Sequence, residues 1–193
     1  MALAGEKLQT VIEGCIKGKP LMQKEFYYAY YSTLMKIAIR YAGTREDAEQ
    51  WVHDGFMKIF AHLDQFRNQG SFEGWIKKIM TRTCIDQLRT SKSLRFEVDN
   101  NTVYSNYELP DHEGFVANDI IEKFSTNDVL DLLRILPEKQ KVVFNLHVFE
   151  AYNHKEIAGL LGITENHSYW LLHQARKQLR EQCSSLTKNK TSI

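Results

Sequence analysis

The sequence lacks any apolar run long enough to cross a membrane. A spanning helix needs roughly 20 consecutive apolar residues, and none of the 193 residues belongs to such a stretch. The N-terminus, MALAGEKLQT, also lacks the basic start and apolar core of a secretory signal. The 43% hydrophobic content is still sufficient for packed cores. We therefore expect a folded protein that stays in the cytoplasm, away from membranes.

Cysteine is scarce, and its positions exclude two kinds of site. Cys15, Cys84 and Cys183 are odd in number, far apart and without a nearby Cys or His partner. A disulfide framework needs paired cysteines, and a structural zinc site needs closely spaced ligands. We expect reduced thiols and no metal.

The motifs of catalysis are missing as well. The sequence has no Gly-rich phosphate loop, no histidine pair at metal-ligand spacing and no nucleophile motif. Its seven histidines form no ligand constellation. We expect neither an enzyme nor a cofactor; an activity lost on metal chelation would contradict this.

Net charge is only +1, which is low for a protein that holds DNA by itself. The charge is unevenly distributed, since no Lys or Arg occurs between Glu97 and Glu122. The stretch from 67 to 95 has only Glu73 and Asp86 as acids. Its bases are Arg67, Lys77, Lys78, Arg82, Arg89, Lys92 and Arg95. The chain therefore has a basic segment followed directly by an acidic one.

The clearest pattern is the succession of helical signals from 136 to 180. Pro137 suits the first turn of a helix that we expect to end near Tyr152. The buried face of that helix is expected at Val142, Val143, Leu146 and Phe149.

Two more helices are expected after Tyr152. Asn153 and Glu156 have the spacing of a reciprocal cap, Gly162 can end this helix, and Thr164 can cap a longer one. The expected inward residues are Ile157, Leu160, Leu161, Ile163, Ser168, Leu171, Leu172, Ala175 and Leu179. Two helices joined by a tight Gly turn form the helix-turn-helix, whose second helix enters the major groove. Short helical hairpins in plain bundles show the same pattern.

The N-terminal half predicts further helices. The Gly18–Pro20 turn separates a short helix from a longer one through Tyr41, and Thr44 with Asp47 has the capping pattern of another. A dense set of aromatics in the second helix favours core packing: Phe26, Tyr27, Tyr28, Tyr30 and Tyr31.

The predicted helix from Arg45 to Phe60 has two distinct faces. Its core face comprises Ala48, Trp51, Val52, Gly55, Phe56 and Ile59. The opposite ridge, which we expect to be exposed, comprises Asp47, Gln50, Asp54 and Met57. A solvated acidic face is one interpretation of this ridge. An apolar Met57 among charges favours a partner surface instead.

The next helix combines a core with a basic face. Phe72, Trp75, Ile76 and Ile79 are expected in the core, while Lys78, Arg82 and Arg89 lie on another face. The polar loop before it, Gln65–Ser71, contains Arg67 and Asn68. A basic ridge can follow a phosphate backbone, and amide side chains can hydrogen-bond to a base turned out of the duplex.

Periodicity fades from Ser91 to about Ser125, which predicts a linker. Helical signals resume with Thr126 as a cap. The expected apolar stripe comprises Val129, Leu132, Leu133 and Leu136.

The wording of four stretches resembles bacterial sigma factors of the extracytoplasmic-function (ECF) group. LPEKQKVVFNLHVFEAYNHKEIAGLLGIT with LLHQARKQLRE is similar to their fourth domain. DAEQWVHDGFMKIFAHLDQF with GSFEGWIKKIMTRTCIDQLR is similar to their second. The resemblance implies an all-α protein of two small helical domains joined by a flexible acidic linker. It implies domain two at 1–92, the linker at 93–125, domain four at 126–182 and a tail at 183–193.

The resemblance also assigns roles and partners. The partners are core RNA polymerase, through the clamp helices of its largest subunit and the flap of the second-largest, and promoter DNA. Core binding falls on Asp47, Gln50, Asp54 and Met57. Recognition and melting of the minus 10 element fall on Arg67, Asn68, Gln69, Lys78, Arg82 and Arg89. Helix-turn-helix contacts near the minus 35 element fall on Thr164, Glu165, Asn166, His167, Tyr169, Trp170, His173, Arg176 and Lys177. The acidic linker would thread the polymerase's basic channels, and an anti-sigma factor or a DNA-targeting protein is a further candidate partner.

The recognition helix departs from that family's pattern because its first basic residue is Arg176. Its expected exposed face is Asn166, His167, Tyr169, Trp170, His173 and Gln174. Phosphate neutralisation supplies most nonspecific affinity, so this helix should bind duplex weakly by itself. Tyr169 and Trp170 fit thymine methyls or a protein partner. A stand-alone helix-turn-helix regulator, which would bind specific duplex alone, and a sigma factor brought to DNA by another protein are the alternatives.

Overall fold

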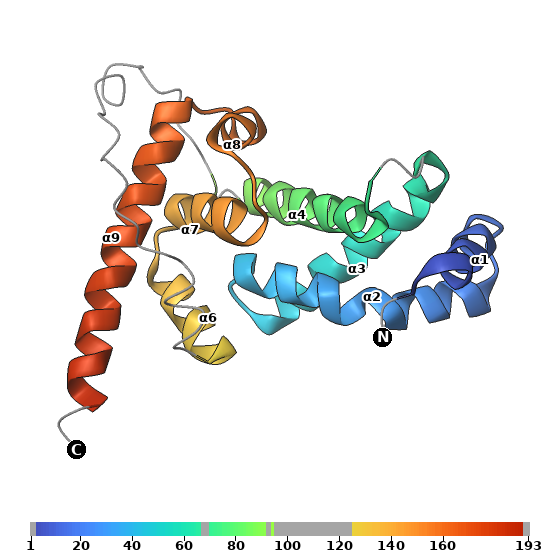
Figure 1. Ribbon diagram of the computed structural model, residues 1–193, viewed down its shortest axis with the longest axis horizontal. Coiled ribbons are helices and arrows are strands. Elements are labelled where there is room, and N and C mark those ends of the chain that lie inside the picture. Colours follow the sequence, from blue (N-terminus) through green and yellow to red (C-terminus); the bar gives the residue numbers. More distant parts are fainter. Residues whose placement is uncertain (1–2, 67–69, 92–93, 95–124, 191–193) are drawn as a thin grey trace. The chain divides into compact units, whose positions relative to one another are not determined.

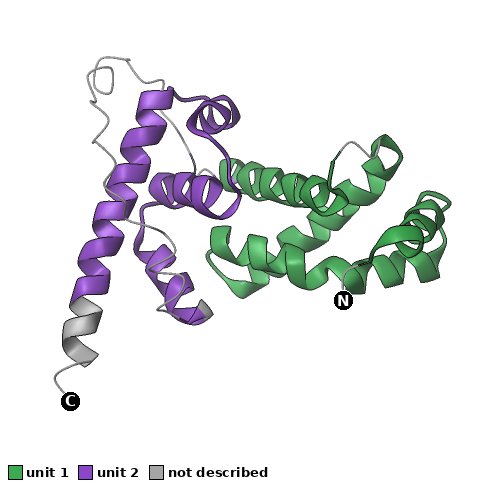
Figure 2. Cartoon of the chain, in the orientation of Figure 1, with its two compact units in different colours: residues 1–90 green, residues 91–193 purple. Residues whose placement is uncertain are grey.

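A computed structural model describes residues 3–66, 70–91, 94 and 125–190. The chain divides into two compact units, residues 1–90 and 91–193 (Figure 2). Within the described ranges every regular element is a helix (Figure 1). The expected all-α class and pair of helical domains are therefore confirmed.

The first unit is built around one long helix. The elements are α1 (Gly5–Ile16), α2 (Pro20–Tyr41), α3 (Arg45–His62), the short 3-10 helix η1 (Leu63–Gln65) and α4 (Phe72–Thr90). Helix α2 packs against α1, α3 and α4. Gly18, at φ +67°, forms the predicted turn after α1, and Pro20, which was assigned to that turn, instead begins α2.

Aromatic rings fill the core between α2, α3 and α4. Phe26 is fully buried and meets Phe56 and Phe72 edge to face, with ring centroids 6.2 and 5.9 Å away. Tyr28 is an exception to the predicted aromatic core, because 71% of it is exposed. It lies two residues after Phe26, which on a helix directs the side chain to the opposite face.

Helices α3 and α4 approach closely at a glycine. A Cβ added at Gly55 would lie 2.7 Å from Sδ of Met80, which is fully buried on α4. The core of α4 extends beyond the predicted positions, through Met80, Cys84, Ile85 and Leu88. Five residues of this unit that were predicted for the core are only half-buried: Tyr27, Tyr31, Trp51, Trp75 and Ile79. For Trp75 the reason is its place at the rim, where it contacts Phe66 and Phe72.

The second unit holds the predicted hairpin. Its elements are α6 (Thr126–Ile135), α7 (Glu138–Phe144), the π-helical turn η2 (Asn145–Phe149), α8 (His154–Leu161) and α9 (Glu165–Lys190). Helix α9 packs against α7 and α8. The segment expected as a tail continues α9 as far as Lys190.

Two boundaries in this unit differ from the sequence-based ones. Ser125, rather than Thr126, caps α6, because its hydroxyl accepts from the backbone of Asp128 while that carboxylate accepts from the Ser125 backbone. The helix after Pro137 ends at Phe149 rather than near Tyr152, and Phe149 is only half-buried. A shift to wider π-helical bonding turns the chain out of the helix earlier.

The predicted helix caps and the glycine turn of the hairpin are confirmed. Asn153 and Glu156 form a reciprocal cap with two 2.9 Å bonds. Gly162 adopts φ +73°, a left-handed conformation that ends α8 at little cost for glycine. The Thr164 hydroxyl accepts from the backbone N–H of His167 and opens α9. These local rules fix the angle at which α9 leaves the turn.

Candidate functional site

The ridge on α3 starts from its cap. The Thr44 hydroxyl accepts from the Asp47 backbone at 3.0 Å and donates to the Asp47 carboxylate at 2.7 Å. Gln50 is exposed, and Met57 is 59% exposed. A thioether that the fold does not cover stands among polar groups, which is the composition expected of a contact surface.

Asp54 differs from the other members of this ridge because it is half-buried. Its carboxylate accepts from Nε2 of Gln87 on α4 at 2.8 Å and from Nε2 of Gln50 at 3.3 Å. The expectation of a fully exposed side chain is therefore wrong. Asp54 joins α3 to α4, so a charge reversal there would disturb packing as well as any partner contact.

The two acids of α4 pair with lysines other than the predicted cations of its basic face. Lys77 pairs with Glu73 at 2.7 Å, and Lys58 of α3 pairs with Asp86 at 3.0 Å. Both acids of the helix are thus occupied. The predicted cations Lys78, Arg82 and Arg89 are exposed, and among the described residues no carboxylate forms an ion pair with Lys78 or Arg82. Arg67, Asn68 and Gln69 lie outside the described residues.

The start of α9 offers a mixed surface. Glu165 and Lys177 are exposed, whereas Thr164, Asn166, Tyr169, Trp170, His173 and Gln174 are half-buried. His167 is only 4% exposed, so its placement on the exposed face is wrong. Its position beside Ser168, on the side of α9 that packs into the unit, explains the burial.

Tyr169 contacts one of two stacked histidines that were not predicted to lie together. Its ring centroid lies 3.6 Å from that of His154, which stacks on His147 of η2 at 4.7 Å. Nδ1 of His154 is 2.9 Å from Oγ of Ser168. One face of Tyr169 is therefore covered by protein. A His at the first position of a predicted helix is the only signal that could have indicated this cluster.

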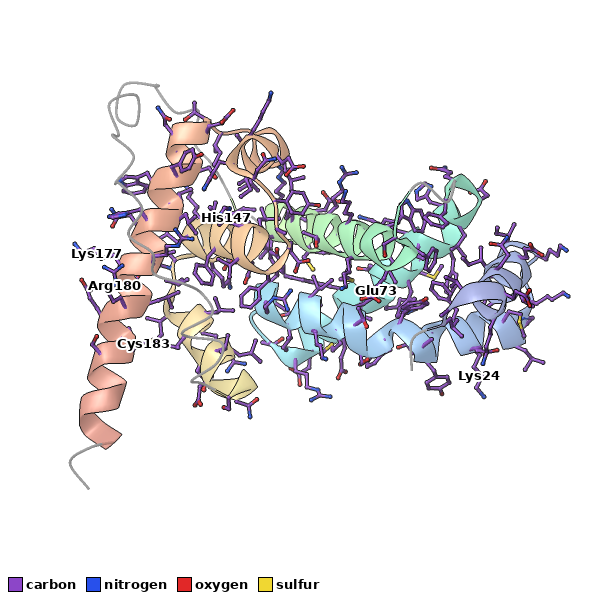
Figure 3. The ribbon with its side chains drawn as sticks, in the orientation of Figure 1. Lys24, Glu73, His147, Lys177, Arg180 and Cys183 are labelled. Atoms are coloured by element: carbon purple, nitrogen blue, oxygen red, sulfur yellow. The ribbon has the colours of Figure 1, made fainter. Side chains whose placement is uncertain are left out.

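Arg176 belongs to the same cluster. Burial lowers its pKa, and its charge acts on both His147 and His154. Its Nε atom is buried and meets no hydrogen-bond acceptor among the described residues. The first fully exposed cation of α9 is therefore Lys177, followed by Arg180 (Figure 3). Exposed positive charge therefore begins at Lys177, one residue later than the first basic residue in the sequence of this helix.

The described residues show neither a metal site nor a membrane span. No cluster of three or more His, Cys, Asp or Glu side chains in these ranges could hold an ion. No helix among them is long and apolar enough to cross a bilayer. All three cysteines are thiols.

One helical unit with a mixed polar and apolar ridge and an exposed basic face, followed in sequence by a helix-turn-helix unit, is an arrangement typical of modular transcription proteins. Residues 26–93 match the family described as Sigma-70 region 2, and residues 126–179 match Sigma-70, region 4. The chain belongs to the sigma-70 family of RNA polymerase sigma factors.

Curated relatives agree with this assignment. The chain is 28% identical over 147 residues to RNA polymerase sigma factor SigV of Bacillus subtilis, covering 76% of this chain and 82% of SigV. It is 24% identical over 161 residues to ECF RNA polymerase sigma factor SigW of the same organism, covering 81% and 86%. The ECF resemblance and the role in promoter-directed transcription initiation are thus supported over most of the chain.

Solved structures show the same fold. Sigma factor RpoE of Bartonella quintana, in complex with the anti-sigma factor NepR, matches with a TM-score of 0.52 at 18% identity, over 83% of this chain and 96% of that one. CnrH, in complex with the cytosolic domain of CnrY, matches with a TM-score of 0.50 at 16% identity, over 91% and 96%.

Proposed function

We propose that this sigma factor binds core RNA polymerase through the solvent-facing ridge of α3. The observation that carries the proposal is the exposure of Met57, which follows Gln50 and Asp54 along the same ridge, on the unit that matches region 2. The clamp helices of the largest polymerase subunit are the expected partner. Such a subunit acts where polymerase and DNA meet, in the cytoplasm, and lends recognition rather than catalysis.

Substitution of Met57 by Lys tests this surface. Because the side chain is mostly exposed, the free energy of unfolding should change by less than about 0.5 kcal/mol. A central apolar contact in an interface contributes about 1–2 kcal/mol or more, so the affinity for core polymerase should fall at least about tenfold. Co-purification and a titration with labelled sigma factor measure this.

The control is Leu21→Lys, which introduces the same side chain at a 75% exposed apolar position on α2. It should leave polymerase affinity unchanged. Equal affinity of wild type and M57K would reject the α3 ridge as the contact. Asp54 is a poorer probe than Met57, because Asp54 accepts a hydrogen bond from Gln87. Its substitution would change the packing of α3 on α4 as well as any affinity for polymerase.

The exposed cations of α4 are proposed to serve promoter opening. Lys78 and Arg82 have no acidic partner within the described ranges and lie on a helix that directly follows the polar loop. Positive side chains there can hold the backbone of the separated strand, while Arg67, Asn68 and Gln69 are proposed to meet a base turned out of the duplex, with Arg89 extending the cationic face.

The double substitution Lys78→Ala, Arg82→Ala should leave core binding intact and lower open-complex formation on duplex promoter. The slope of log affinity against log salt on single-stranded promoter DNA should fall by about 0.7 for each lost phosphate contact. A premelted template should restore much of the activity, because the unstacking cost is then already met. Lys77→Ala is the control, since its charge is paired with Glu73. Equal failure on duplex and premelted templates would assign these residues another role.

The fourth domain is proposed to face the minus 35 region with Thr164, Glu165, Asn166, Tyr169, Trp170, His173 and Lys177. With few exposed cations at its start, α9 should add little phosphate-derived affinity, and the opened minus 10 strand should carry more of promoter choice. The domain assignment also gives the flap of the second-largest polymerase subunit, and an anti-sigma or DNA-targeting protein, as candidate partners of this chain.

A further inference from the structure

The three elements around the helix-turn-helix meet at stacked imidazole rings. His147 of η2 lies against His154, the first residue of α8, and His154 lies against Tyr169 of α9. Two hydrogen bonds fix the rings: Nδ1 of His147 is 3.1 Å from the carbonyl oxygen of Tyr152, and Nδ1 of His154 is 2.9 Å from the Ser168 hydroxyl. This stack connects the supporting helix to the recognition helix.

The surroundings of His154 favour its neutral form. Burial is the main cause that lowers its pKa, to about 4, and the charges of His147 and Arg176 add to it. The positive end of α8, whose first residue is His154, acts in the same direction. Burial and Arg176 also lower the pKa of His147.

The acids of the neighbouring elements do not compensate for these charges. On α8, the Glu156 carboxylate is bonded to the backbone of Asn153. On α7, Glu138 pairs with Lys141 at 3.1 Å. Among the described residues, no carboxylate contributes to the ionisation of His154. Protonation of either histidine would place a second positive charge near Arg176 in a site that is largely shielded from water.

We propose that His154 is a positioning residue for promoter recognition, holding α9 on α8 through Ser168 and Tyr169 only while its imidazole is neutral. Protonation then releases the recognition helix, and domain four loses its grip on duplex DNA. The proposal rests on the proposed function for its last step, whereas the release of α9 is independent of DNA. Tyr169, on this account, supports the helix more than it reads bases.

The direction and the pH window follow from the two ionisation states. The folded pKa of His154 lies below the ordinary value of 6.5, so its contribution to stability is complete above 6.5 and is lost as the pH falls toward about 4. Between about pH 7.5 and about pH 5.5, the equilibrium for releasing α9 should shift about tenfold toward the released state.

The first experiment measures release without DNA. Full-length protein is titrated from about pH 7.5 to about pH 5, with hydrogen exchange on α8 and α9 and the fluorescence of Trp170 in a background where Trp51 and Trp75 are Phe. Wild type should lose protection in α8 and α9 as the pH falls. His154→Phe, which keeps a ring on Tyr169 but cannot ionise, should show a much flatter profile. His53→Gln, the same substitution at an exposed position on α3, should keep the wild-type profile.

NMR of the histidine rings in wild type provides a second test that needs no variant to fold. His154 should titrate well below 6.5, and a normal titration of His154 would overturn the proposal. So would equal loss of protection in wild type and H154F. If H154F does not fold, His154→Gln, which can still bond to Ser168, takes its place and should also show the flat profile.

The second experiment measures promoter duplex binding by holoenzyme at about pH 7.5 and about pH 6. The ratio of wild-type to H154F affinity for duplex promoter should be smaller at the lower pH. Both proteins should bind the premelted minus 10 template with equal affinity. A constant ratio, with α9 release still observed, would show that domain four does not contribute to promoter binding, and would sink the DNA step. Failure of both proteins to bind promoter at either pH would count against the proposed function, and the hydrogen-exchange result would still decide the release step.

Discussion

The contact between Gly55 and Met80 predicts an unusual response to a conservative substitution. Gly55→Ala in a helix interior should by itself stabilise by about 0.5–1 kcal/mol. Here the new Cβ would lie 2.7 Å from Sδ and 3.5 Å from Cε of a fully buried methionine. Overpacking of this kind costs about 1–3 kcal/mol. We expect a net destabilisation of about 0.5–2 kcal/mol, with α3 displaced from α4.

The matched control lies on the neighbouring helix. At Gly74 the nearest atom to a new Cβ is Cβ of Ser71 at 3.7 Å, an ordinary contact, so Gly74→Ala should be neutral or stabilising by up to about 1 kcal/mol. Urea unfolding of full-length protein carrying Trp170→Phe follows the first unit through Trp51 and Trp75. The double variant G55A/M80A should lose less free energy of unfolding than the sum of the losses of the two single variants, because Met80→Ala removes the atoms that the new Cβ meets. If G55A stabilises as much as G74A, the end of the Met80 side chain has moved aside at little cost, and the overpacking argument is refuted.

Three further predictions concern the second unit, the thiols and the caps. Gly162→Ala must place a side chain at φ +73°, so it should destabilise the second unit by about 1 kcal/mol, measured by Trp170 fluorescence, and Gly162→Asn should cost less. Burial raises the pKa of Cys15 to about 11, so iodoacetamide at neutral pH should label half-buried Cys183 well before Cys15, as followed by mass spectrometry; equal rates would contradict the burial. Asn153→Ala should cost about 1 kcal/mol in urea unfolding, and no change would mean that the reciprocal cap does not form in solution.

Local chemistry made the hairpin predictable. The caps at Asn153 and Thr164, and the stop at Gly162, each depend on residues within a few positions of one another, so the sequence contains all the atoms involved. The apolar period likewise located most buried residues of α8 and α9, although Leu160 and Ile163, which were also predicted to point inward, are only half-buried. Predicted helix boundaries were wrong by a residue or more where two neighbouring residues could each act as the cap, as with Ser125 and Thr126.

Contacts between helices were not predictable from the sequence. The bond between Asp54 and Gln87 joins residues 33 positions apart, and it converts a predicted surface charge into a link between α3 and α4. His147, His154 and Tyr169 belong to three elements whose relative placement the helical period does not specify. The prediction for Tyr28 was wrong because the density of aromatic residues does not show which side of α2 faces the core. Tyr28 lies on the other side.

The packing redistributes the charge that remains available for DNA. On α4, Lys77 and Lys58 neutralise both acids of the helix, which leaves Lys78 and Arg82 exposed. On α9 the first base, Arg176, is drawn into the histidine cluster. A chain with a net charge of only +1 therefore presents cations beside the proposed melting surface while the start of its recognition helix stays nearly uncharged. Since phosphate contacts supply sequence-independent affinity, we expect such a protein to bind a promoter more strongly once the strands have begun to separate.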